Sequence, residues 1–70
     1  MLRLRVKEVA KEKNVAMAKL SRMADISYKT VQAIFHNPYH DASLHTLNAI
    51  AKALNVEAIS LLEEAPDEGN

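Results

Sequence analysis

Two short helices joined by a three-residue turn are predicted from residues 17–36, which read MAKLSRMADISYKTVQAIFH. Apolar residues at helical spacing predict one helix over about 17–24, with Leu20, Met23 and Ala24 inward, and a second over about 28–36. The turn at 25–27 is so short that the two helices must cross at a steep angle. This arrangement is typical of a helix-turn-helix unit.

The inner and outer sides of this unit differ in composition. We expect Leu20, Ile26 and Val31 to meet on the inner side and to hold the two helices together. The second helix then presents an outer face that reads Tyr28, Lys29, Thr30, Gln32, Ala33 and His36. Hydrogen-bonding side chains can read base edges in the major groove, and a small one suits a thymine methyl group. A solvated helix face is also polar, so the short turn and the flanking helices are what favour DNA.

The rest of the chain is also predicted to be helical, over about 4–13, 44–54 and 57–64, which makes an all-α fold of five helices. The clearest apolar spacing in the chain is Leu44, Leu47, Ile50, Ala51 and Leu54. In the last helix, Ile59 and Leu62 are expected to face the core. No run of β-branched or aromatic residues alternates with polar ones, so little in the sequence indicates a sheet.

Polar residues mark where these helices begin and end. Ser27 and Ser43 can each cap the helix that follows by accepting a backbone hydrogen bond. Four residues stand just after an apolar stretch and tolerate the left-handed backbone that often ends a helix: Asn14, Asp25, Asn37 and Asn55. Asn37 is the doubtful member, because Pro38 pushes it toward an extended backbone.

Seventy residues form one domain, which we place at 1–65, followed by a flexible acidic tail at 66–70. Residues 1–52 carry nine basic and four acidic side chains, whereas residues 53–70 carry five acidic and no basic ones. This distribution fits an anionic partner at one end of the domain, although ordinary surface charge would explain it equally well. The chain has no Cys and no long apolar run, so we expect a soluble, cytoplasmic protein without disulfides or membrane segments.

Several stretches of the sequence match a known family. They are VKEV at 6–9, KLS at 19–21, DIS at 25–27, KTV at 29–31 and, most specifically, LHTLNAIAKALNV at 44–56. Through them, residues 6–62 resemble the Xre/Cro phage-repressor type of helix-turn-helix domain. The resemblance implies a lambda-repressor-like five-helix bundle that binds duplex DNA sequence-specifically, usually as a homodimer.

The resemblance also implies roles for individual residues. Tyr28, Lys29 and Ala33 would face bases, with Thr30 and Gln32 nearby. The segment that contains His36, Asn37 and Tyr39 would lie along the phosphates. For Tyr39, packing over the edge of the core is an alternative role, because a small core needs large aromatic side chains.

Two departures from the family pattern carry further expectations. The family usually begins its second helix with a capping Ser and a DNA-contacting Gln, where this chain has Ala16 and Met17. The family often pairs an Arg in its first helix with a Glu in its third, where this chain has Ala10 and Phe35. Because both charges are missing together, no buried charge is stranded, and we expect Phe35 to pack near Ala10.

Other functional classes find little support in the sequence. The spacing His36-x3-His40-x4-His45 can bind zinc, but Pro38 interrupts the segment and no Cys assists, so we expect no metal site. No catalytic triad or Gly-rich phosphate loop is present, so we expect no enzyme, cofactor or small-molecule substrate. Arg3 and Arg5 are interpreted as a solvated terminus.

Two hypotheses for function remain. The first is a transcriptional regulator, acting as a repressor, that binds a two-fold operator as a dimer. Ile59, Leu61 and Leu62 could supply the dimer contact, or Ile59 and Leu62 could close the core and leave Leu61 exposed. The second is a protein-interaction or antitoxin-like module with the same fold and weak DNA binding, which the zero net charge, Met17 and the single Lys of the recognition helix favour.

Overall fold

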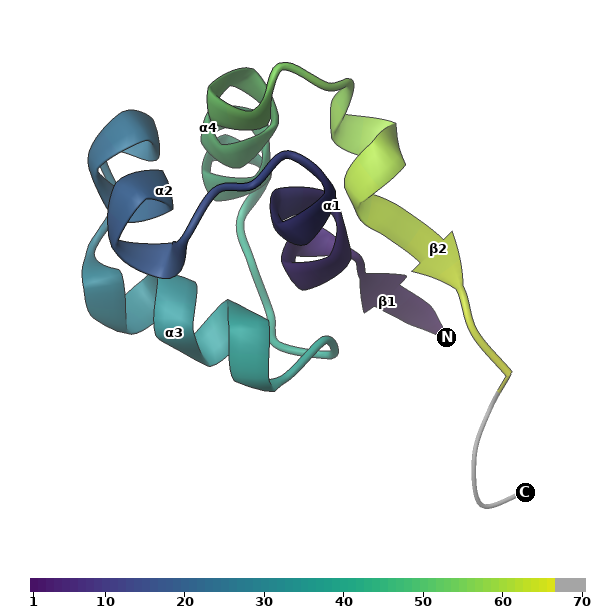
Figure 1. Ribbon diagram of the computed structural model, residues 1–70. Coiled ribbons are helices and arrows are strands. Elements are labelled where there is room, and N and C mark those ends of the chain that lie inside the picture. Colours follow the sequence, from purple (N-terminus) through teal and green to yellow (C-terminus); the bar gives the residue numbers. More distant parts are fainter. Residues whose placement is uncertain (67–70) are drawn as a thin grey trace.

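Four α-helices, a short 3-10 helix and a two-stranded antiparallel sheet form the computed structural model, which describes residues 1–66 (Figure 1). The helices are α1 (Val6–Glu12), α2 (Met17–Ala24), α3 (Tyr28–His36), α4 (Leu44–Leu54) and the 3-10 helix η1 (Ala58–Leu61). The strands are β1 (Leu2–Leu4) and β2 (Leu62–Glu64). The expected acidic tail lies outside the described residues, apart from Pro66.

The prediction of five helices without a sheet is wrong at both ends of the domain. The segment expected to form a helix over 57–64 makes only the short η1 and then extends as β2, which pairs with β1 so that Leu4 lies opposite Leu62. A helix of so few residues is marginal, because it makes few internal hydrogen bonds. Pairing with β1 instead satisfies the backbone groups of both segments across the sheet.

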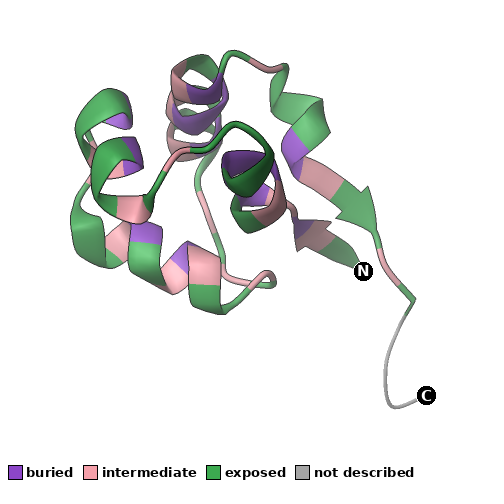
Figure 2. Ribbon diagram, in the orientation of Figure 1, coloured by how far each residue is buried: buried purple, intermediate pink, exposed green. Residues whose placement is uncertain are grey.

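The core lies between the four helices, β1 and η1 (Figure 2). Its largest fully buried side chains are Val6, Leu20, Val31, Ile34, Ile50 and Leu61. Leu61 was expected in a dimer contact or exposed, and Ile59 was expected in the core or in that contact. The structure buries Leu61 completely and leaves Ile59 75% exposed. The short 3-10 turn changes the phase of the segment, so the inward position moves from Ile59 to Leu61.

Two further apolar residues point outward although their spacing predicted burial. Leu44 is 85% exposed, and Met23 is exposed as well. Leu44 is the first residue of α4, where the helix extends past the edge of the core. Helical phase by itself therefore does not guarantee burial near a helix end.

Three of the four expected left-handed residues have that conformation. Asn14, Asp25 and Asn55 have φ angles of 63°, 56° and 58°. Asn37 has φ −133° and an extended backbone, as its position before Pro38 requires. The chain thus ends α2 and α4 at Asp25 and Asn55, residue types that tolerate this backbone better than most non-glycine residues.

The ends of the described chain are joined by ion pairs, so the expectation that Arg3 and Arg5 are simply solvated is wrong. The Nη1 of Arg3 lies 2.7 Å from a carboxylate oxygen of Glu8 and 2.8 Å from one of Glu63. Arg5 Nε lies 3.7 Å from Glu63. Burial alone would raise the pKa of Glu8, but the hydrogen bond and charge of Arg3 lower it below its usual value. The hydrogen bond that Arg3 donates to Glu8 in turn raises the pKa of Arg3.

None of the helices within residues 1–66 has the length and apolar character needed to cross a membrane.

Candidate nucleic-acid interface

The turn between α2 and α3 is held by both backbone and side-chain contacts. Asp25 has a left-handed backbone, which ends α2 and redirects the chain. The Ser21 hydroxyl then donates to the Ile26 carbonyl oxygen at 2.6 Å, and the Ile26 N–H donates to the Ser21 carbonyl. Leu20 and Val31 are fully buried and Ile26 is half-buried against the same core. The predicted contact that locks the two helices is therefore present.

The start of α3 is capped as predicted. The backbone N–H of Thr30 donates to the Ser27 hydroxyl at 3.1 Å, and the two hydroxyl oxygens lie 2.9 Å apart. The helix α4 repeats this arrangement with Ser43 and Thr46, at 3.0 Å. Thr30 is only partly exposed, and its hydroxyl is engaged in the cap. Its structural role therefore accounts for its position more directly than a DNA contact does.

The remaining residues expected on the outer face of α3 divide by exposure. Tyr28, Lys29, Gln32 and His36 are exposed. Ala33 is half-buried and lies among them on the helix. The helix therefore buries Val31 and Ile34 against the core and presents hydrogen-bonding side chains and one ammonium group outward.

Asn37 and Tyr39 lie in the loop just beyond α3, and both are exposed. The Asn37 side-chain oxygen accepts a hydrogen bond from the Tyr39 N–H at 3.1 Å, which is the geometry of an Asx turn. This contact fixes the loop where the chain leaves the helix. The Tyr39 ring is 44% exposed and lines a shallow groove, so it has a packing role while still facing solvent.

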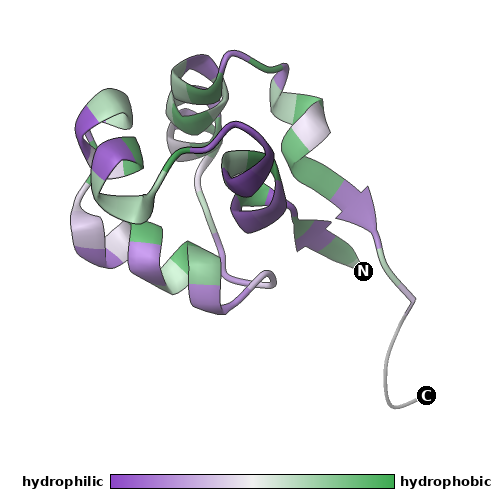
Figure 3. Cartoon of the chain, in the orientation of Figure 1, coloured by the Kyte–Doolittle hydropathy of each residue, from purple (hydrophilic) through white to green (hydrophobic). Residues whose placement is uncertain are grey.

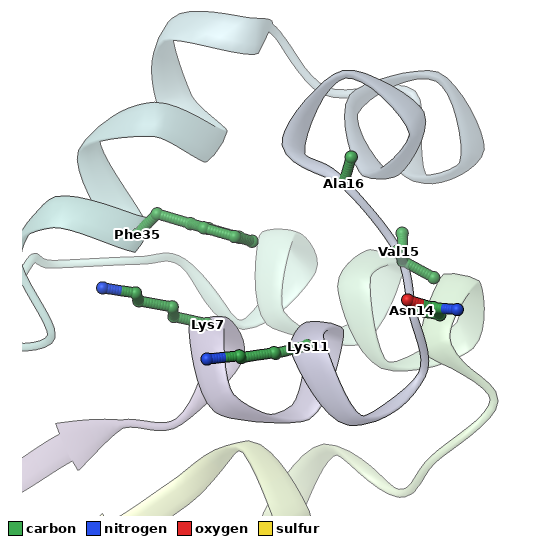
Figure 4. A pocket seen from close by; sticks show the side chains of 6 residues that line it. All are labelled: Lys7, Lys11, Asn14, Val15, Ala16 and Phe35. Carbon is green, nitrogen blue, oxygen red and sulfur yellow. The ribbon is translucent and has the colours of Figure 1, made fainter.

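A second cluster of functional interest was not foreseen from the sequence. An open pocket of about 470 Å³ lies between α1, the start of α2 and α3 (Figure 4). Its lining residues are Lys7, Lys11, Asn14, Val15, Ala16 and Phe35. Phe35 is half-buried and packs against the core that includes Ala10, in line with the expected exchange for an Arg–Glu pair. The usable signal was the spacing of Lys7 and Lys11, which places both on one side of α1.

Ala16 precedes α2 without a side-chain hydrogen bond to the helix. The missing cap predicted from the sequence is thus confirmed. The backbone N–H groups at the start of α2 therefore have no capping side chain as partner, unlike those of α3 and α4. The pocket between α1 and α3 adjoins this helix start through Ala16.

The charged side chains separate in space. The acidic residues of β2 are held by Arg3, Arg5 and the N-terminal amine. None of the lysines in the described part of the chain forms an ion pair, among them Lys7, Lys11 and Lys29. The outward side of α1 is strongly hydrophilic (Figure 3). The side formed by α1, α2 and α3 therefore keeps a positive charge although the net charge of the whole chain is zero.

Metal binding finds no support over residues 1–66, where no group of three or more potential ligands of the His, Cys, Asp and Glu types is close enough to hold an ion.

Comparison with solved structures places this architecture among DNA-binding proteins. A protein from Bacteroides fragilis that is described as DNA-binding shares 28% identity, with a TM-score of 0.80 over 90% of this chain and 100% of that chain. SinR in complex with DNA shares 24% identity, with a TM-score of 0.72 over 77% of this chain and 86% of that chain. The chain matched in the SinR–SinI complex shares 23% identity, with a TM-score of 0.73 over 80% of this chain and only 54% of that chain. No curated protein matches the chain.

A family model agrees with the structural likeness. The model of the Cro/C1-type HTH DNA-binding domain matches residues 5–67, which is nearly the whole sequence. It confirms the resemblance found in the motifs, and the family consists of DNA-binding regulators that are not enzymes. The chain therefore belongs to the Cro/C1-type helix-turn-helix family of DNA-binding domains.

Proposed function

We propose that this protein is a transcriptional repressor that binds a specific duplex DNA site as a homodimer, with α3 in the major groove. The observation that carries the proposal is the two-sided character of α3. Val31 and Ile34 anchor it in the core, while Lys29 and Gln32 are exposed on the same helix, which follows a short, hydrogen-bonded turn. A rigid helix with donors and acceptors on its free side has the geometry that reads base edges.

Within this proposal the α3 residues take different roles. Lys29 donates to guanine, Gln32 pairs with adenine and Tyr28 contacts the first base or its phosphate. Ala33 offers a small apolar surface to a thymine methyl group. The role of Thr30 is to hold the cap with Ser27.

Phosphate contacts would position the helix. His36, Asn37 and Tyr39 lie at the far end of α3 and would follow one strand of the backbone. Lys7 and Lys11 add two ammonium groups on the α1 side, and neither has a carboxylate partner within residues 1–66. They would replace part of the phosphate binding that Met17, an apolar residue, cannot supply.

The proposal is tested by fluorescence anisotropy on mixed-sequence duplex DNA across a salt series. Binding should weaken steeply as salt rises, because each neutralised phosphate releases counterions. The Lys7→Ala and Lys11→Ala variants should each lower the slope of log K against log salt by about 1. Absence of binding at about 50 mM salt would contradict the proposal and favour a protein-interaction module.

Specificity is tested on a selected site. Lys29→Ala should cost about 1–3 kcal/mol of binding to that site and leave the fold intact. Lys52→Ala is the matched control, since it removes the same charge from α4, on the opposite side of the molecule from α3 (Figure 1). Equal losses in the two variants would show that α3 does not read bases.

Repression is tested separately, by transcription in vitro from a promoter that overlaps the selected site. A bound dimer should block polymerase access and lower the transcript level in proportion to occupancy of the site. The Lys29→Ala variant should leave transcription unchanged at the same concentration. Increased transcription with the wild-type protein would mean that the regulator activates.

A further inference from the structure

An apolar groove lies just beyond the C-terminal end of α3, on a surface that shares only Tyr39 with the proposed DNA contacts. Its volume is about 260 Å³, and it is formed by β1, the loop after α3 and the start of α4. Three large apolar side chains on its walls face solvent: Leu2 at 60%, Tyr39 at 44% and Leu44 at 85% exposure. We call this surface the Leu44 groove.

The charges of the Leu44 groove argue against nucleic acid as its occupant. Its walls carry one arginine, one histidine and one aspartate, Arg3, His40 and Asp41, whereas a DNA surface carries unpaired positive charge. Exposed apolar side chains gathered around a groove are typical of contacts with another protein. A protein with apolar side chains and both signs of charge at the rim therefore fits this surface.

We propose that the occupant of the Leu44 groove is a second copy of this chain, which makes the contact of the homodimer. This inference rests on the DNA-binding homodimer proposed above and names its interface. A two-fold contact places the same surface on both sides, so every charge on it needs its opposite on that surface. The Leu44 groove meets this condition, because Arg3 of one copy can face Asp41 of the partner subunit.

The two groups are available for such a pair. Both ion pairs of Arg3 use its Nη1 atom, and the guanidinium group carries further N–H donors on its other nitrogens. Asp41 is exposed and has no ion pair within residues 1–66. Leu44 and Leu2 would supply the apolar centre of the contact between these charges.

The position of the groove also fits the spacing of a two-fold DNA site. Two recognition helices in successive major grooves lie about 34 Å apart, so each helix centre must lie about 17 Å from the dimer axis. The nine residues of α3 place its centre about 7 Å from its C-terminal end. The three residues from Asn37 to Tyr39 span at most about 10 Å more. An axis at the Leu44 groove is therefore within reach of this spacing.

The experiment is sedimentation velocity over a wide range of protein concentrations, with two matched variants. Leu44→Asp should raise the dimer Kd about tenfold or more, because two carboxylates would meet at the centre of the contact. The variant should still fold, since Leu44 is exposed and an acidic residue in the first turn of a helix is favourable. Circular dichroism checks this. Ile59→Asp changes a comparably exposed apolar residue outside the groove and should leave the Kd unchanged.

Charge reversal at the rim gives a second measurement. Asp41→Arg should raise the dimer Kd, because it removes the proposed pair between Arg3 and Asp41. High salt, which screens that pair, should also raise the dimer Kd of the wild type. A wild-type protein that stays monomeric at every concentration, or a dimer that Ile59→Asp disrupts and Leu44→Asp does not, would overturn the inference.

DNA binding by the Leu44→Asp variant separates this inference from the proposed function. A monomer that binds a half-site with the salt dependence of the wild type shows that DNA reading survives without the dimer. A wild-type dimer that Leu44→Asp disrupts, but that binds no DNA, would support the interface and contradict the proposed function. A wild-type monomer that binds half-sites would contradict the interface and support DNA reading by α3.

Discussion

The side of the domain formed by β1 and β2 (the sheet side) and the side formed by α1, α2 and α3 (the helix side) use positive charge in different ways. On the sheet side, Arg3 and Arg5 are held by the carboxylates of Glu8 and Glu63. On the side formed by α1, α2 and α3, the lysines have no carboxylate within ion-pair distance in the described residues. The first arrangement joins the chain ends, and the second leaves positive charge available to an anionic partner.

This contrast explains why net charge is a poor guide to the function of this chain. Nine basic and nine acidic side chains cancel in the sum, and a net charge of zero by itself disfavours nucleic acid. The acidic residues of β2 lie across the molecule from α3, where they pair with the N-terminal segment (Figure 1). Because a DNA contact depends on local charge within about 10 Å, the spatial separation matters more than the total.

If the sheet side is purely structural, Leu61→Ala should have the largest effect on stability and none on DNA reading. Leu61 is fully buried, and its carbonyl accepts the Arg5 N–H at 2.7 Å. Removing a buried leucine side chain should lower the free energy of unfolding by about 2–5 kcal/mol, measured by urea denaturation. DNA affinity corrected for the folded fraction should not change. A loss of affinity in the folded protein would show that the two sides are coupled.

Completing the missing cap should strengthen the helix side. Ala16 has φ −76° and ψ 162°, close to the values of the capping Ser27 and Ser43. Ala16→Ser should therefore accept a hydrogen bond from the start of α2 and stabilise the fold by about 1 kcal/mol in thermal or urea unfolding. The control is Ala18→Ser, inside the same helix, where a serine should give no gain. Equal effects at both positions would contradict the capping argument.

Releasing the arginines should leave DNA binding unchanged if the two sides are independent. Glu63→Gln removes the carboxylate that contacts both Arg3 and Arg5. We expect only a small loss in melting temperature, because exposed ion pairs contribute little. The salt slope of DNA binding should stay the same if neither guanidinium group contacts a phosphate. A slope steeper by about 2 would show that both guanidinium groups reach phosphates.

The smallest effect is expected from acid. Folding lowers the pKa of Glu8, so its ionised form stabilises the folded state above the usual glutamate pKa of 4.5, and this contribution is lost as the pH falls further. The difference in melting temperature between wild type and Glu8→Gln should therefore be present at neutral pH and vanish in acid. Glu12→Gln, which removes an exposed carboxylate without an ion pair in the described residues, should show no such trend. A constant difference for Glu8→Gln would argue against the Arg3–Glu8 pair.

Much of the helix side follows from short-range signals. Helices α2, α3 and α4 begin and end where apolar spacing and capping residues predict. The outer face of α3 was also foreseen, but the engagement of Thr30 with Ser27 was not, because polar spacing does not reveal which hydroxyl is already used. The pocket at Lys7 and Phe35 was missed as well, because its walls come from α1, from the loop before α2 and from α3.

Local order in this protein is encoded in contacts between residues a few positions apart, such as the cap from Ser27 to Thr30 and the left-handed Asp25. These depend on residue type and backbone preference, so they can be inferred from the chain alone. The sheet, the exposure of Leu44 and the pairing of Arg3 with Glu63, residues 60 positions apart, depend on how distant segments meet in space. The packing of the whole domain decides which distant segments come into contact, because a short strand has no stable partner until the fold supplies one.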